Sequence, residues 1–277
     1  MQRAAVFAVL AVSQWAPWIL AGLGVAPVGA AVAGATLFAA AVWWAVRRTE
    51  PGVRTSWGLS PARPAGRLLA TGVLGGTLAY LAVFVVRWWG GRGPATGVHA
   101  ADVVPVVVTG LLVAGYQAFS EEVVFRGAVF TLLPPSVSVR AAVAVSTALF
   151  VLFHAPRWPD LMSGPYALHL VLAGLAFALA YVRTGSLWLG MGLHAGWNVG
   201  AYLLREGDPA LLRLTGALPE GWAGWSSWAG VAGNAALLLL VLLLTRDRVD
   251  RPGAGRVRTG RDGGPRTGTG RERPVSR

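Results

Sequence analysis

Long runs of hydrophobic residues, broken by short polar stretches, dominate the chain. A helix needs about 20 mainly apolar residues to cross a bilayer, and eight segments approach that pattern. They are residues 4–24, 27–46, 68–86, 104–125, 141–157, 166–182, 187–204 and 227–245. The pattern predicts an all-α fold, a polytopic integral membrane helix bundle of about eight transmembrane helices that fills residues 1–245.

Composition supports the membrane assignment. Hydrophobic residues make up 55% of the 277 residues and charged residues only 13%, about half the charged fraction of a soluble domain. An ordinary soluble enzyme and a disordered chain are therefore excluded. The chain has no cysteine, which excludes disulfides, zinc–thiolate sites and cysteine nucleophiles.

The tryptophans give a second membrane signal. Amphipathic rings prefer the interface between bilayer and water, and several tryptophans cluster near the predicted helix ends. These are Trp43, Trp44, Trp88, Trp89, Trp188 and Trp228.

The arginines predict how the helices are oriented. The loop 47–67 and the tail 246–277 are rich in arginine, which favours the cytoplasmic side. With eight spans, 18 arginines fall on the inner side and 5 on the outer side, so both termini are expected in the cytoplasm of a multi-pass cell-membrane protein. Alternatively, residues 4–24 are a signal peptide, but seven further hydrophobic segments favour a first transmembrane helix.

The basic tail raises the question of nucleic acid. The net charge is +12 and the tail carries 10 of the 24 arginines. It lacks the interleaved aromatic residues that stack on bases, and glycine and proline interrupt it. We therefore expect residues 246–277 to be a disordered, solvated cytoplasmic tail, and we expect the lipid bilayer, not nucleic acid, as a partner.

Two adjacent acids lie deep in the segment 104–125. An ionisable residue at mid-helix costs about 2.5–3.5 kcal/mol on an insertion scale, so such residues usually face a cavity or a partner. Glu122 and Arg126 are four residues apart and can form an ion pair on one helix face. Glu121 is rotated by about 100° and has no basic partner in its own helix, which makes it a candidate base. Alternatively, both acids lie at the headgroup boundary and are solvated.

Two further polar clusters lie in other hydrophobic segments. His154 ends the fifth segment, and the seventh places His194 and Asn198 on one helix face, four residues apart. Gly190, Gly192 and Gly196 beside them would allow a backbone or a substrate to approach closely. Each histidine alone is more often a helix–helix contact. His99 and His169 have no polar partner at helical spacing and are assigned no role.

Together the clusters supply what hydrolysis of a peptide bond requires. A carboxylate without a local counter-ion can take a proton from water, and one imidazole can position that water. An imidazole and a carboxamide can donate hydrogen bonds to a developing oxyanion. No sequence context marks Ser120 or Ser146 as an activated nucleophile.

These residues resemble a known family, the CAAX protease and bacteriocin-processing (CPBP) family of intramembrane glutamic endopeptidases, also called Abi or type II CAAX prenyl endopeptidases. The resemblance covers about residues 104–204. Its motifs are Glu121-Glu122-x-x-x-Arg126, Phe150-x-x-x-His154 and His194-x-x-x-Asn198, with Phe125-Arg126-Gly127, Thr184-Gly185-Ser186-Leu187-Trp188 and Trp57-Gly58-Leu59 as context. The resemblance implies an eight-helix membrane fold, Glu121, His154, His194 and Asn198 as catalytic residues, and Glu122 and Arg126 as supporting residues.

The predicted function is therefore an intramembrane endopeptidase that acts without a cofactor on membrane-associated peptides or proteins. Three alternatives stay open at this level. Two acids and two histidines could ligate zinc in a membrane metallopeptidase, although the compact His-Glu-x-x-His arrangement is missing. The scaffold could also serve a non-proteolytic immunity or regulatory protein, or a transporter, since acids within membranes also mark ion paths.

Overall fold

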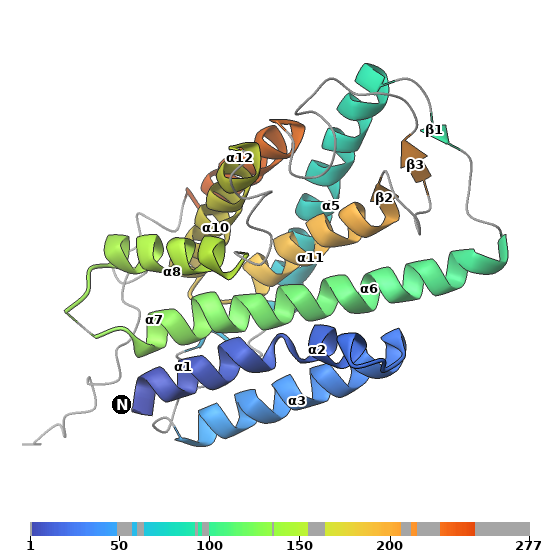
Figure 1. Ribbon diagram of the computed structural model, residues 1–277. Coiled ribbons are helices and arrows are strands. Elements are labelled where there is room, and N and C mark those ends of the chain that lie inside the picture. Colours follow the sequence, from blue (N-terminus) through green and yellow to red (C-terminus); the bar gives the residue numbers. More distant parts are fainter. Residues whose placement is uncertain are drawn as a thin grey trace, which may run out of the picture.

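The computed structural model describes residues 2–48, 57–59, 64–91, 94–95, 100–134, 136–154, 164–205, 212–214 and 228–246. In these ranges the chain is almost entirely helical (Figure 1). The helices, labelled as in Figure 1, are α1 (Gln2–Ser13), α2 (Ala16–Gly22), α3 (Pro27–Arg48), α5 (Pro64–Gly91), α6 (Ala100–Glu122), the π-helix η1 (Val123–Ala128), α7 (Val129–Leu132), α8 (Val139–Phe153), α10 (Pro165–Thr184), α11 (Trp188–Leu203) and α12 (Trp228–Leu244). Three very short strands, β1 (Pro94–Ala95), β2 (Leu204–Arg205) and β3 (Leu212–Leu214), form a small sheet in the order β1-β3-β2.

The helices agree with the predicted all-α membrane fold, and each of the eight predicted segments contains at least one helix. Within the described ranges, four helical stretches are long and apolar enough to cross a membrane: Gly29–Arg48, Pro64–Trp89, Val103–Leu132 and Pro165–Thr184. The pair α1 and α2 makes a fifth if it is one bent span, whereas α8 and α12 are shorter apolar helices. The described residues thus give an almost entirely helical, multi-pass membrane protein with four or five qualifying spans, where eight were expected. Residues 247–277 of the predicted tail lie outside the described residues.

The segment 4–24, predicted as one helix, is broken. Helices α1 and α2 meet at a 45° bend after Ser13. Pro17 explains the break, because proline has no amide hydrogen and its ring collides with the carbonyl group four residues earlier, here that of Ser13. Gln14 and Trp15 therefore lie in the bend between the two helices.

The segment 104–125, in contrast, is longer than predicted. Helix α6 continues without interruption through η1 and α7 to Leu132. All six residues of η1 are buried, and the Ser146 hydroxyl of α8 donates to the Phe125 carbonyl at 2.8 Å. π-helical turns inside α-helices occur frequently at functional sites, and this one directly follows the two acids.

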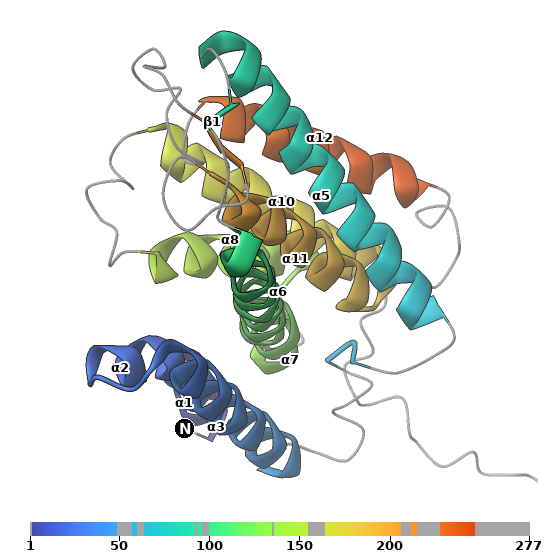
Figure 2. The ribbon, with the colours of Figure 1, turned by 90° about the vertical axis from the view of Figure 1, so that its right-hand side faces the viewer.

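Glycines allow α5 and α11 to pack with their backbones in contact; Figures 1 and 2 show the two helices side by side. A Cβ atom on Gly192 would collide with the Leu69 carbonyl, and one on Gly196 with the Val73 carbonyl. The predicted close approach at these two glycines is confirmed. Since α11 carries His194 and Asn198, this contact fixes both on a rigid support.

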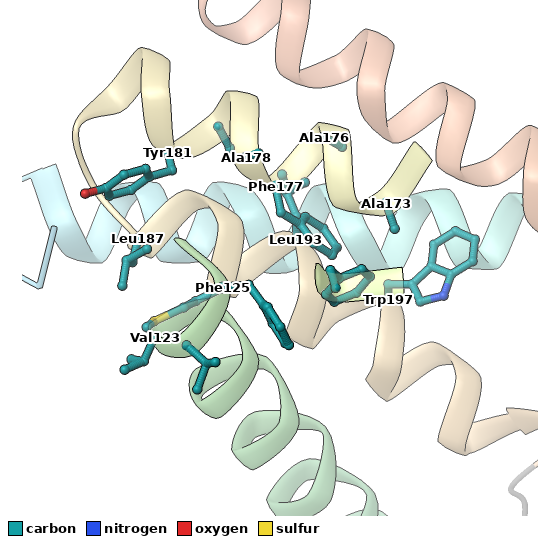
Figure 3. Packing of buried hydrophobic residues seen from close by; sticks show 14 of the residues in the cluster. Val123, Phe125, Ala173, Ala176, Phe177, Ala178, Tyr181, Leu187, Leu193 and Trp197 are labelled. Atoms are coloured by element: carbon teal, nitrogen blue, oxygen red, sulfur yellow. The ribbon is translucent and has the colours of Figure 1, made fainter. Parts of the chain in front are cut away.

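Buried apolar side chains of η1, α10 and α11 surround the site (Figure 3). A short segment outside the helices completes this core. Trp57 is fully buried, and the Leu187 amide donates to the Gly58 carbonyl at 3.0 Å. Gly58 has φ +70°, and a Cβ there would lie 2.8 Å from the Tyr181 ring. Thus Trp57-Gly58-Leu59 ties the N-terminus of α11 in place.

Candidate active site

A cavity of about 380 Å³ opens between the bend of α1 and α2 and helices α6, α8, α10, α11 and α12. Residues from all of these elements line it, and the four predicted catalytic residues are among them. Its charged, imidazole and amide side chains are Gln14, Gln117, Glu121, His154, His169, His194, Asn198 and Asn234. The fold therefore brings together three clusters that lie on separate helices.

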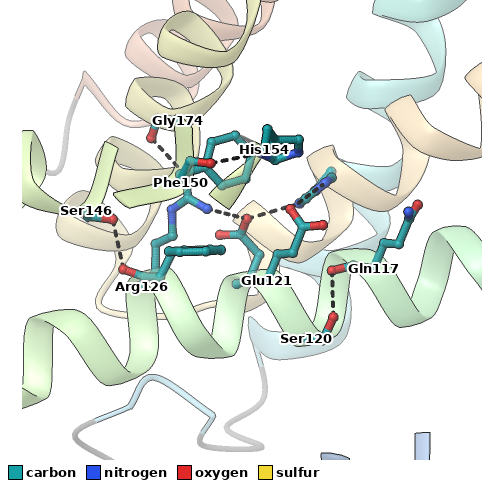
Figure 4. A network of polar contacts seen from close by, with 11 residues as sticks. Gln117, Ser120, Glu121, Arg126, Ser146, Phe150, His154 and Gly174 are labelled. Carbon is teal, nitrogen blue, oxygen red and sulfur yellow. Dashed lines mark hydrogen bonds and ion pairs between the residues drawn. The ribbon is translucent and has the colours of Figure 1, made fainter. Parts of the chain in front are cut away.

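Glu122 and Arg126 form the predicted ion pair. The Arg126 Nη1 donates to Glu122 Oε1 at 2.9 Å, and neither residue is exposed (Figure 4). The Arg126 Nη2 donates to the Gly174 carbonyl of α10 at 3.0 Å. The guanidinium carbon also lies 4.6 Å from the ring centroid of Phe150 and 5.3 Å from that of Phe177. The pair thus links η1 to α8 and α10 in a site closed to water.

Glu121 has a different environment. It is 8% exposed, and among the described residues no hydrogen-bond partner contacts its Oε2. The nearest ionisable nitrogen to that oxygen is Nε2 of His194 at 3.9 Å, which is too long for a direct hydrogen bond. As expected from the helical spacing, Glu121 faces away from Arg126 and toward the cavity (Figure 4).

His194 lies between the two acids. Its Nδ1 lies 3.1 Å from Glu122 Oε1, and it donates to that oxygen because a carboxylate ion-paired with Arg126 can only accept. The imidazole stacks on Phe177 with ring centroids 4.8 Å apart and planes at 14°. These contacts fix the ring with Nε2 directed at the side of the cavity where Glu121 lies.

His154 occupies the residue that ends α8. Its Nδ1 lies 2.8 Å from the Phe150 carbonyl, and since a carbonyl only accepts, this nitrogen carries the hydrogen. In the neutral ring, Nε2 is then left as a hydrogen-bond acceptor. His154 also lines the cavity, so this lone pair is available to a group bound there.

Asn198 has a partner that the sequence analysis missed. Its Nδ2 donates to Gln117 Oε1 at 3.3 Å, across 81 residues of sequence. Gln117 precedes Glu121 by one helical turn and so shares its face. That spacing is a signal that could have indicated Gln117.

The structure also places His169 in the cavity wall, although no role was assigned to it. Its Nδ1 lies 3.0 Å from the Asn234 amide nitrogen, which also donates to the Gly230 carbonyl at 3.1 Å. The isolated amide of Asn234 in the very apolar segment 227–245 was the available signal. His99 lies outside the described residues.

The two candidate serines have backbone partners. The Ser146 hydroxyl donates to the Phe125 carbonyl, and that of Ser120 donates to the Gln117 carbonyl at 3.2 Å. Neither contact activates a nucleophile. Within the described ranges, no group of three or more His, Cys, Asp or Glu residues is arranged to hold a metal ion.

Comparison with known proteins places the site within a family. Residues 103–200 match the family model described as "Type II CAAX prenyl endopeptidase Rce1-like". The matched segment runs from α6 into α11 and carries Glu121, Glu122, Arg126, His154, His194 and Asn198. None of the curated proteins and none of the solved structures matches the chain. The resemblance predicted from the motifs is therefore confirmed by a match of residues 103–200 to the Rce1-like family model.

Proposed function

We propose that the protein is an intramembrane endopeptidase that hydrolyses membrane-associated peptides or proteins with a water molecule activated by Glu121. One observation carries this proposal. Glu121 is a buried carboxylate that lines the cavity and has no cation within hydrogen-bond distance, whereas its neighbour Glu122 lies outside the cavity lining and is ion-paired with Arg126 through Oε1. A buried charge without a partner is costly, so a protein that retains one uses it.

In the proposed reaction, Glu121 takes a proton from water and the hydroxide attacks the carbonyl carbon of the scissile bond. A new C–O bond forms, and the carbonyl oxygen becomes an oxyanion. The C–N bond then breaks, and Glu121 returns its proton to the leaving nitrogen. The acceptor nitrogen of His154, Nε2, receives a hydrogen bond from the attacking water and orients it.

The oxyanion binds to His194 and Asn198. Asn198 Nδ2 has two hydrogens and uses one of them on Gln117, so the other is available. His194 already donates from Nδ1 to Glu122, so its Nε2 donates to the oxyanion when both ring nitrogens carry a hydrogen. Preorganised donors of this kind typically contribute a factor of about 10²–10³ each.

Glu122 and Arg126 serve as supporting residues in this scheme. Arg126 neutralises Glu122, and Glu122 holds the ring of His194. Their contribution is the position of His194, with no direct contact to the substrate.

We further propose that both termini lie in the cytoplasm. The distribution of 18 arginines on the inner side and 5 on the outer side supports this orientation. Arg47 and Arg48 at the end of α3 lie over the rings of Trp43 and Trp44, an arrangement suited to the headgroup region. The partners are the lipid bilayer and a membrane-associated substrate, with no nucleic acid, and residues 246–277 form a basic tail.

The test uses purified protein in vesicles with a panel of quenched, membrane-associated peptides. Glu121→Gln keeps the shape of the side chain and removes the base, so the rate of cleavage is expected to fall about 10²–10⁴-fold. Ser120→Ala, next to it on the same helix, is the matched control and is expected to cleave like the parent. Equal rates for Glu121→Gln and the parent would refute the proposed base.

Two further experiments distinguish the alternative functions. Stoichiometric zinc in the active protein, with activity lost on chelation and restored by zinc, would favour the metallopeptidase. In cells, a phenotype that survives Glu121→Ala and His154→Ala at normal protein levels would favour a non-proteolytic immunity or regulatory role.

A further inference from the structure

The bend between α1 and α2 brings an unsatisfied amide to the cavity. Gln14 is 1% exposed and lines the cavity that contains Glu121. Among the described residues, neither its Nε2 nor its Oε1 has a hydrogen-bond partner. A buried primary amide offers two donors and one acceptor oxygen, and leaving all of them unused costs free energy.

The position of Gln14 is fixed by the elements around it. Its own carbonyl accepts from the Tyr116 hydroxyl of α6 at 2.9 Å. On the other side, Pro17 packs directly against Gly34 of α3, where a Cβ atom would overlap the proline ring. The backbone of the bend is therefore held between α6 and α3.

Aromatic side chains extend the cavity from Gln14 toward the surface of the protein. The Trp15 ring packs on Phe153 of α8 with centroids 4.8 Å apart. Trp18 lies 5.8 Å from Trp15 and is 41% exposed. Both tryptophans line the cavity with Gln14, so an apolar wall leads from the outside of the helix bundle to the buried amide.

We propose that the bend is a substrate subsite in which the Gln14 amide binds a backbone peptide group beside the scissile bond, while Trp15 and Trp18 contact an apolar side chain of the substrate. This inference rests on the proposed endopeptidase function. A peptide group presents one N–H and one C=O, which match the acceptor and the donors of Gln14. An extended substrate has no intramolecular hydrogen-bond partners for these groups. Its peptide group can therefore form hydrogen bonds with the buried amide of Gln14. The subsite lies outside residues 103–200, in a part of the chain that the family match does not include.

The first test separates binding from catalysis. Gln14→Leu keeps the approximate size of the side chain and removes both hydrogen bonds, so KM for the peptides that the parent cleaves should rise about tenfold, with kcat within about twofold. Ser13→Ala, one residue earlier and outside the cavity, removes a hydroxyl bonded to the Leu10 carbonyl and should leave both constants unchanged. An unchanged KM in Gln14→Leu would overturn the subsite and leave the endopeptidase proposal standing.

The second test does not depend on cleavage. Because the chain has no cysteine, Gln14→Cys in a Glu121→Gln background carries a single thiol, and Ser13→Cys in the same background is the control. The probe is a synthetic apolar peptide of about 20 residues with one cysteine, in phosphatidylcholine vesicles. With an added chemical oxidant that accepts the two electrons, disulfide formation should be at least about tenfold faster at position 14 than at position 13, because position 14 lines the cavity and position 13 does not, and excess cysteine-free peptide should suppress it.

The outcomes of the two proposals are distinguishable. Cross-linking at position 14 without cleavage by the parent protein would retain the peptide-binding subsite and remove the endopeptidase. Equal cross-linking at positions 13 and 14 would overturn the subsite whether or not the parent cleaves.

Discussion

The site has two sides with opposite character. On the closed side, Glu122 Oε1 accepts from Arg126 and from the Nδ1 of His194 in a buried network, while Glu122 Oε2 and Arg126 Nε have no hydrogen-bond partner among the described residues. On the open side, Glu121 and Gln14 face a cavity of about 380 Å³ with polar atoms that have no hydrogen-bond partner in the described chain. Adjacent residues of one helix, Glu121 and Glu122, thus belong to different environments.

This difference indicates that the closed side stabilises the protein and that the open side is available to bind a ligand. The attraction between two paired buried charges offsets the free energy lost when they leave water. If one of them is removed, the other stays buried without that compensation. Unpaired groups carry that cost all the time, so their replacement by neutral groups loses little stability. Substitutions on the closed side should therefore lower the free energy of unfolding, and those on the open side should change function alone.

The largest effect is expected for Arg126→Met. This change leaves the Glu122 carboxylate buried without its cation and removes the bond to the Gly174 carbonyl. The free energy of unfolding should fall by about 3–5 kcal/mol, measured as a lower Tm of the purified protein in detergent micelles. The double variant Arg126→Met with Glu122→Leu, which removes both charges, should recover part of the loss. No recovery would mean that the pair is not what the closed side depends on.

A direct comparison of the two acids should give the next largest effect. Glu122→Gln replaces a charge-assisted hydrogen bond and should cost about 1.5–3 kcal/mol. Glu121 has no such bond at Oε2. Glu121→Gln should therefore change the free energy of unfolding by less than about 0.5 kcal/mol. Tm is measured for both variants under the same conditions, and the fall should be larger for Glu122→Gln than for Glu121→Gln. Equal losses would erase the distinction between the two sides.

The ion pair of the closed side was predictable from sequence because it is local. Glu122 and Arg126 are four residues apart on one helix, so helical geometry alone brings them together, and apolar surroundings predict that they pair. Four residues that line the cavity, Glu121, His154, His194 and Asn198, were also picked out from sequence, because polar groups of these kinds within hydrophobic segments are few.

The open side depends on contacts that no local rule supplies. The Asn198–Gln117 bond spans 81 residues and the His169–Asn234 contact spans 65, so only the packing of whole helices brings these groups together. The break after Ser13 was missed because the apolar pattern of residues 4–24 outweighed the single Pro17. The π-helix at Val123–Ala128 was missed because hydrophobic periodicity does not distinguish it from an α-helix over so few residues.

A smaller effect is expected for Gly190→Ala. A Cβ atom there would lie 3.1 Å from Glu122 Oε2, so the carboxylate must move by a few tenths of an ångström away from its position against Arg126 and His194. The loss should be about 1–2 kcal/mol, in the lower part of the range for overpacking. Gly115→Ala on α6 is the matched control, since a Cβ there meets nothing within 4 Å, and it should stabilise by about 0.5–1 kcal/mol. A neutral Gly190→Ala would show that the closed side tolerates movement of its acid.

The smallest effect is expected for Ser146→Ala, which tests whether the closed side extends to the π-helix. The Ser146 hydroxyl of α8 is the side-chain donor to the Phe125 carbonyl at 2.8 Å, and this bond ties η1 to the helix that ends at His154. Its loss should lower stability by about 1 kcal/mol. Ser120→Ala removes an equally buried hydroxyl that bonds only within α6, so it should cost less than about 0.5 kcal/mol. Tm gives the two losses, and hydrogen exchange should accelerate at the η1 amides in Ser146→Ala alone. Faster exchange in both variants would mean that the bond between helices has no special part in holding η1, and that the closed side ends at Arg126.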